Sequence, residues 1–117
     1  MAITPTEFGG AVSVDGYGPG FFRVAGQVWR GPVIATAAGA RAWGGLDDMA
    51  ALSTLAGQVD VLFLGLGAEM GRPPAALMRT LEDAGVPVEA MASPTAARTY
   101  NVTLSEGRRV ACALIPV

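Results

Sequence analysis

Two glycines after an apolar run invite comparison with nucleotide-binding loops. The run covers residues 59–64, and Gly65-Leu66-Gly67 follows it directly. The dinucleotide-binding fingerprint needs another glycine three residues after the second one, with a helix beginning there. In this sequence that position is Met70, and the next helix signal waits until Pro73. A tight turn from strand to loop is therefore favoured over a dinucleotide site.

A polar cluster near the C-terminus is the second place where chemistry could occur. Ser93 and Thr95 stand at the predicted start of a helix, and Arg98 and Asn101 follow on one of its faces. A helix N-terminus and a guanidinium group can hold an anion between them. The residues leave a second reading open, in which Arg98 and Asn101 tie the helix to a neighbouring loop.

These two groups of residues are expected to meet at one edge of a sheet. Residues 59–64 and 86–91 read as strands, and the loops that follow parallel strands open on the same edge. Arg72, at the end of the first loop, would add positive charge. The sequence thus predicts a small anion-binding cleft, framed by Gly65, Gly67, Arg72, Ser93, Thr95, Arg98 and Asn101.

Many side chains on which enzymes rely are missing. All eight basic residues are Arg, and His is absent, which excludes a Ser-His-Asp triad, a Schiff-base lysine and a His-ligated metal. Cys112 is the only cysteine and lies in an apolar run, so a structural role is favoured. Asp47 and Asp48 are adjacent, which suits a helix cap better than paired catalytic carboxylates. We expect no metal and no cofactor.

Composition points to an α/β protein with one core. The chain has 117 residues, of which 51% are hydrophobic, and this suits a single domain over residues 1–117. Its net charge of -2, without a basic run, argues against nucleic-acid binding. The start of the sequence does not resemble a signal peptide, and no apolar run is long enough for membrane insertion. These features predict a cytoplasmic protein.

The predicted elements fall into a β-rich first third and an alternating remainder. Turn-forming and apolar residues predict early strands at 11–14, 21–25, 28–30 and 33–37, with a turn at 15–20 and a loop at 38–41. Helix-start signals at Asp47-Asp48, Pro73-Pro74 and Ser93-Pro94 then alternate with strands at 59–64, 86–91 and 109–115. Such short connections indicate a sheet whose later strands are largely parallel.

The chain resembles a family of small proteins of unknown function, one that includes a vertebrate adipogenesis-associated protein and a mitochondrial assembly factor for respiratory complex I. The matching segments are residues 15–19, Trp43, residues 61–67, residues 98–102 and residues 106–116. This resemblance implies a three-layer α/β domain with a central mixed sheet and an N-terminal β-hairpin addition. The family commonly has a hydroxyl residue between the two loop glycines, where this sequence has Leu66.

The resemblance also implies an assembly or interaction role without an established catalytic activity. Together with the missing catalytic side chains, it favours a cytoplasmic, non-enzymatic protein that binds a protein partner, as a complex-assembly factor does. The alternative is a small-molecule (anion) binding protein or an enzyme that uses the cleft at the ends of the central strands. A homo-oligomeric structural module is a third reading.

Overall fold

A five-stranded sheet forms the centre of the protein, whose computed structural model describes residues 11–69 and 71–117. Its strands stand in the order β5-β4-β8-β6-β7. Their bounds are β4 Val33–Thr36, β5 Gly39–Ala42, β6 Val61–Gly65, β7 Val88–Met91 and β8 Val110–Leu114. β6 is parallel to β7 and β8, whereas β4 is antiparallel to β8 and β5. The prediction of a central mixed sheet is therefore confirmed.

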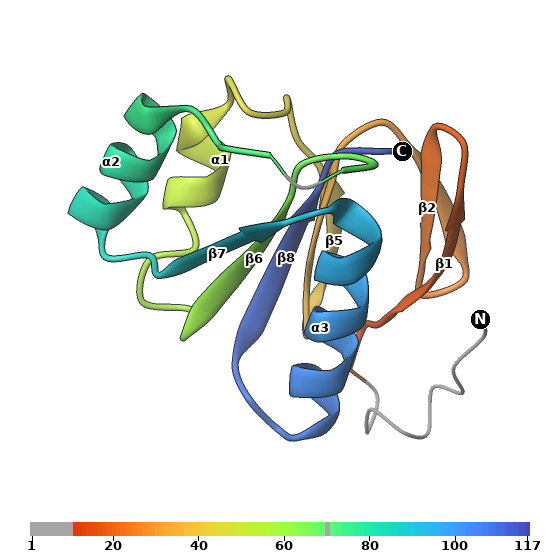
Figure 1. Ribbon diagram of the computed structural model, residues 1–117. Coiled ribbons are helices and arrows are strands. Elements are labelled where there is room, and N and C mark those ends of the chain that lie inside the picture. The colour runs from red at the N-terminus through yellow and green to blue at the C-terminus, as the bar shows by residue number, and fades with distance from the viewer. Residues whose placement is uncertain (1–10, 70) are drawn as a thin grey trace.

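Helices cover both faces of this sheet, which gives the expected layers (Figure 1). The helices are α1 (Met49–Ser53), α2 (Ala75–Ala84) and α3 (Ser93–Ser105). α1 and α2 lie on one face, and α3 lies on the other. No helix among the described residues is long and apolar enough to cross a membrane.

The two central strands are apolar along their whole length. Every residue of β6 and β8 is buried, as expected for strands covered on both faces. Alternation then divides β6 between two core clusters, with Leu62 and Leu64 facing α1 and α2 while Val61 and Phe63 face α3. Leu62 and Leu64 are each 0% exposed.

The N-terminal addition is a three-stranded antiparallel sheet rather than a simple hairpin. It consists of β1 (Val14–Gly18), β2 (Phe21–Val24) and β3 (Gln27–Arg30), in sequence order. The predicted turn at 15–20 is wrong for most of its length, because β1 continues to Gly18 and only Pro19-Gly20 turns. A Cβ on Gly18 would lie 2.5 Å from the ring of Phe21, so this glycine makes room for an aromatic side chain.

The predicted loop at 38–41 is also wrong. Only Ala37 and Ala38 turn, and the chain returns as β5 with Gly39 opposite Thr36. Glycine and alanine have low strand propensity, so this edge strand follows from pairing with β4 rather than from its side chains. Gly31-Pro32 separates β3 of the small sheet from β4 of the main sheet.

Helix ends follow the predicted signals in part. Asp48 caps α1 and accepts from the backbone N–H of Ala51 at 3.4 Å, and Gly85 ends α2 in a left-handed conformation with φ of 81°. α1 is short and ends at Ser53. Ser93 is the first residue of α3 and makes no capping hydrogen bond, because its hydroxyl group is engaged elsewhere.

Candidate functional site

The structure brings three of the predicted cleft residues into direct contact. Gly65 ends β6, Gly67 lies in the loop that follows, and Ser93 begins α3. The Ser93 hydroxyl accepts from the backbone N–H of Gly67 at 2.9 Å and donates to the carbonyl of Ile115 at 2.6 Å. The backbone N–H of Ser93 donates to the carbonyl of Gly67 at 2.8 Å. The two loops therefore meet at one edge of the sheet, as their parallel strands predict.

Little space remains between these loops. A Cβ on Gly65 would lie 2.6 Å from the hydroxyl oxygen of Ser93 and 2.7 Å from its Cα. Ser93 is fully buried, and the carbonyl of Gly65 accepts from the backbone N–H of Ile115. The polar groups of the three predicted residues thus pair with one another or with the C-terminal segment, and anion binding at this position stays a prediction.

The close contact at Gly65 makes Gly65→Ala a sensitive variant. The added methyl group meets backbone, which cannot move as a flexible side-chain tip can, so we expect a loss of about 1–3 kcal/mol in the free energy of unfolding. Gly39→Ala is the matched control, because a Cβ there meets nothing within 4 Å. Urea titration of both variants measures the difference in the free energy of unfolding. Equal values would show that the contact between Gly65 and Ser93 is loose enough to accept a methyl group.

Arg72 and Thr95 lie at the surface of the protein. Arg72 is exposed in the loop before α2, and Thr95 is exposed in the first turn of α3. The carbonyl of Thr95 accepts from the hydroxyl of Thr99 at 2.9 Å, within the helix. Arg98 and Asn101 lie further along α3 and line a different hollow, between α3 and β1.

Asn101 joins the N-terminal sheet to α3. Its side-chain oxygen accepts from the backbone N–H of Val14 at 2.9 Å, and its amide group donates to the carbonyl of Val14 at 2.7 Å. The hydroxyl of Tyr100, the residue before Asn101, donates to the carbonyl of Val12 at 2.6 Å. Asn101 is only 7% exposed, so this paired contact is a buried structural brace. The bracing role left open by the sequence therefore describes Asn101, whereas Arg98 is exposed.

The hollow beside this brace is here named the β1–α3 groove. It holds about 370 Å³ and is lined by Val14, Asp15, Gly16, Tyr17, Pro94, Ala97, Arg98, Asn101 and Val102. Two large hydrophobic side chains are exposed at it, Tyr17 at 50% and Val102 at 58%. Arg98 and Asp15 are its charged residues, and the Asp15 carboxylate accepts from the backbone N–H of Gly26.

Sequence reasoning missed Tyr17 and Val102. Tyr17 falls in the glycine-rich stretch at 15–20, for which the sequence predicts a turn. Its position on a strand, and therefore the face that it occupies, does not follow from that prediction. Val102 offered a signal, because it is an apolar residue that lies off the buried stripe of α3 formed by Ala96, Tyr100 and Leu104. An apolar side chain on the polar face of a helix is a candidate contact point.

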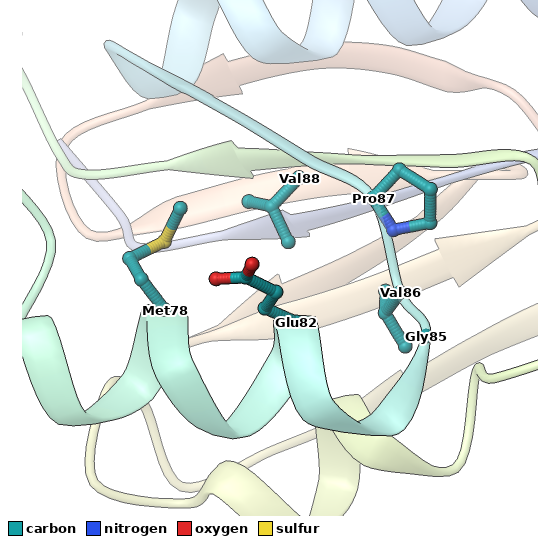
Figure 2. A pocket seen from close by; sticks show the side chains of 6 residues that line it. All are labelled: Met78, Glu82, Gly85, Val86, Pro87 and Val88. Carbon is teal, nitrogen blue, oxygen red and sulfur yellow. The ribbon is translucent and has the colours of Figure 1, made fainter.

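A second hollow lies between α2 and β7, and is here named the α2–β7 pocket. It holds about 340 Å³ and is lined by Met78, Glu82, Gly85, Val86, Pro87 and Val88. Figure 2 shows the side chains of Met78, Glu82 and Val88 directed into the same space between helix and strand. β7 forms one edge of the main sheet, so this pocket opens beside an edge strand.

Cys112 has the structural role that its apolar surroundings predict. It is fully buried in β8, and burial raises the pKa of its thiol well above the usual range. Burial likewise raises the pKa of the Tyr100 hydroxyl. Both groups therefore stay protonated in the folded protein and neither is an activated nucleophile. Within residues 11–69 and 71–117, no three acidic or Cys side chains gather as a metal site.

These two buried groups predict a loss of stability in alkali. The folded state keeps its protons at a pH where the unfolded chain releases them, so stability is full below about pH 8.5 and falls as pH rises above it. Cys112 alone contributes a slope of up to about 1.4 kcal/mol per pH unit, and Tyr100 adds to it above about pH 10. Urea titrations from pH 7 to 10 measure this. Cys112→Ala should remove the loss near pH 9, and a wild-type profile that stays flat would contradict the prediction.

Comparison with known proteins places the chain among relatives along its whole length. A family described as protein of unknown function (DUF498/DUF598) matches residues 14–115. An uncharacterised protein of Rhodobacter capsulatus is 53% identical over 117 residues, covering 100% of this chain and 94% of that protein. NADH dehydrogenase [ubiquinone] 1 alpha subcomplex assembly factor 3 of Danio rerio is 28% identical over 123 residues, covering 99% of this chain and 71% of that protein.

Solved structures share the fold. An outer membrane protein from Bartonella henselae superposes with a TM-score of 0.80 and 31% identity, covering 91% of this chain and 95% of that one. A Mth938-like domain from Bordetella pertussis gives a TM-score of 0.74 and 27% identity, covering 99% of this chain and 90% of that one. These neighbours confirm the α/β fold. The assembly-factor relatives confirm the resemblance to a family that includes an assembly factor for respiratory complex I.

Proposed function

This chain belongs to the DUF498/DUF598 family, and we propose that it is a non-enzymatic protein that binds another protein during assembly of a larger complex. The observation that carries the proposal is the β1–α3 groove, where Tyr17 and Val102 expose apolar surface beside Arg98. Exposed aromatic and apolar side chains next to an arginine are typical of the residues that dominate protein interfaces. The assembly-factor relatives support the same role.

The partner that fits this groove has an apolar anchor and a carboxylate. The anchor would pack between Tyr17 and Val102, and the carboxylate would face the exposed guanidinium group of Arg98. The Tyr17 ring is already supported by Phe22, with ring centroids 5.6 Å apart, so little side-chain freedom is lost when a partner covers it.

Matched surface variants test the proposal. Val102→Glu places a charge in the groove, whereas Val28→Glu makes the same change at an exposed valine of β3 outside it. Both tagged variants and the wild type would be expressed at native level, and captured proteins would be quantified by mass spectrometry. We expect one partner captured by wild type and Val28→Glu to be lost from Val102→Glu at unchanged melting temperature. The same captured proteins for all three chains would contradict the role of the groove.

Anion binding is the alternative that the same groove can test. Carboxylates, phosphates and nucleotides would be titrated against the wild type and Arg98→Ala, with amide chemical shifts as the readout. Saturable shifts around α3 that disappear in Arg98→Ala would favour a small-molecule role over a protein partner. Unchanged spectra in both chains would leave protein binding as the function of this surface.

We also propose that the protein works in the cytoplasm. The free thiol of Cys112 suits a reducing compartment. The Bartonella henselae neighbour is described as an outer membrane protein, which makes the membrane the competing location. Cell fractionation followed by immunodetection distinguishes the two, and recovery of the chain in the membrane fraction after a high-salt wash would contradict a cytoplasmic location.

A further inference from the structure

The outer edge of β7 carries backbone groups that face away from the sheet. The backbone N–H groups of Leu62 and Leu66 donate to the carbonyls of Pro87 and Met91, at 2.8 and 2.9 Å. Because successive residues of a strand face opposite sides, Val88 and Ala90 direct their N–H and C=O groups outward. Among the described residues, no hydrogen bond reaches these four groups. The edge is thus available for pairing with another strand.

One face of this edge is an apolar pocket with an acidic wall. Val88 packs toward α1 and α2, and Met78 and Glu82 of α2 line the α2–β7 pocket beside it (Figure 2). A long side chain with an aliphatic stem fits such a pocket, since its stem can cover Met78 and Val88 while its charged tip meets Glu82. Lysine and arginine have this form.

The other face of the edge is also acidic. Glu89 follows Val88, so its side chain lies on the face toward α3, and it is exposed. Glu82 is exposed as well, and the salt bridge recorded among the described residues joins Arg109 to Asp60 instead. The edge therefore presents a carboxylate on each face, and neither carboxylate is in an ion pair there.

We propose that β7 accepts an extended segment of a partner protein as an additional strand, and that this segment carries neighbouring basic residues. Backbone hydrogen bonds to Val88 and Ala90 would hold it in register. Two consecutive basic side chains would then point to opposite faces, one toward Glu82 in the pocket and one toward Glu89. The net charge of -2 of the whole chain favours such a partner.

A second copy of this chain suits the edge poorly. In an antiparallel pair of two β7 strands, the register that joins Val88 of each copy to Ala90 of the other places Glu89 opposite Glu89. Like charges directly opposite one another destabilise a strand pair. This edge is formed by β7 and α2, whereas the β1–α3 groove is formed by β1 and α3. Strand addition at β7 therefore does not depend on the proposed use of that groove.

Peptide titration tests the proposal on the full chain. The probe is an end-blocked hexapeptide of sequence TKKVTV, and its matched control TEEVTV differs only in charge. Backbone amide shifts and hydrogen exchange of the isotope-labelled protein are the readouts. We expect TKKVTV to shift and protect the amides of Val88 and Ala90, and we expect TEEVTV to leave them unchanged. A version of TKKVTV with N-methylated backbone amides should not bind, because it cannot pair as a strand.

Variants of the protein separate charge from strand pairing. Glu82→Gln combined with Glu89→Gln should weaken TKKVTV binding by roughly three- to tenfold, since exposed ion pairs are individually weak. Glu106→Gln, an exposed change at the far end of α3, should have no effect. Ala90→Pro removes an outward N–H without touching the bonds to β6, so it should abolish binding. The melting temperature of each variant checks the fold.

Three results would overturn the proposal. The first is equal binding of TKKVTV and TEEVTV, or of the N-methylated peptide, which would exclude charge-guided strand pairing. The second is protection of β1 and α3 amides with none at Val88 and Ala90. The third is self-association of the free chain in sedimentation experiments that Ala90→Pro removes, which would make a second copy the occupant of the edge.

Discussion

Replacing Leu62 with Ala is expected to lower the free energy of unfolding by about 2–5 kcal/mol, through lost burial and the cavity that remains. Leu62 is 0% exposed and lies in β6, between the parallel strands β7 and β8. Its side chain packs in the cluster beneath α1 and α2, and tightly packed surroundings collapse only partly into a cavity.

Urea titration measures the loss, with Val28→Ala as a control at an exposed position of β3. The control should change stability by less than about 0.5 kcal/mol. A change below roughly 1 kcal/mol for Leu62→Ala would mean that β6 is a peripheral strand, against its position between β7 and β8.

Asn101→Ala is expected to cost about 2–4 kcal/mol, because it leaves both backbone groups of Val14 without their partners in a buried site. Two hydrogen bonds are lost together, and residues 87 positions apart in the chain are no longer joined. The neighbouring variant Val102→Ala, on the exposed side of the same helix, is the control.

Hydrogen exchange locates the effect of Asn101→Ala. The amides of β1 should lose protection more than those of β6, because Asn101 fixes β1 to α3 whereas β6 is held by its own sheet. Unchanged protection of β1 would show that the packing of Val14, Phe22 and Val24 against the core holds the small sheet without Asn101.

The parts of the fold that the sequence predicts are those with strong local signals. The continuous apolar runs of β6 and β8 and the Pro73-Pro74 signal at the start of α2 have direct structural counterparts. β5 was missed because Gly39 and the alanines beside it have little strand preference of their own. The first strand was predicted at residues 11–14 but lies at Val14–Gly18, because Gly16 and Gly18 are common in turns yet are extended here through pairing with β2.

The candidate site divides in the same way. Parallel pairing of β6 and β7 correctly brings Gly67 and Ser93 together, but only the positions of individual atoms show that Ser93 fills the space. The β1–α3 groove depends on how the small sheet docks on α3, a contact between opposite ends of the chain that no local pattern contains. For the same reason, the sequence alone does not distinguish an Asn101 side chain that bonds Val14 from one that binds a ligand.

The place of β8 in the sheet has a consequence for how the chain folds during synthesis. β8 follows every other described element in sequence, yet it lies between β4 and β6 and pairs with both. Until β8 leaves the ribosome, the strands on either side of it have unpaired inner edges, which are prone to join other chains. The main sheet therefore closes only after translation has passed residue 114, the last residue of β8.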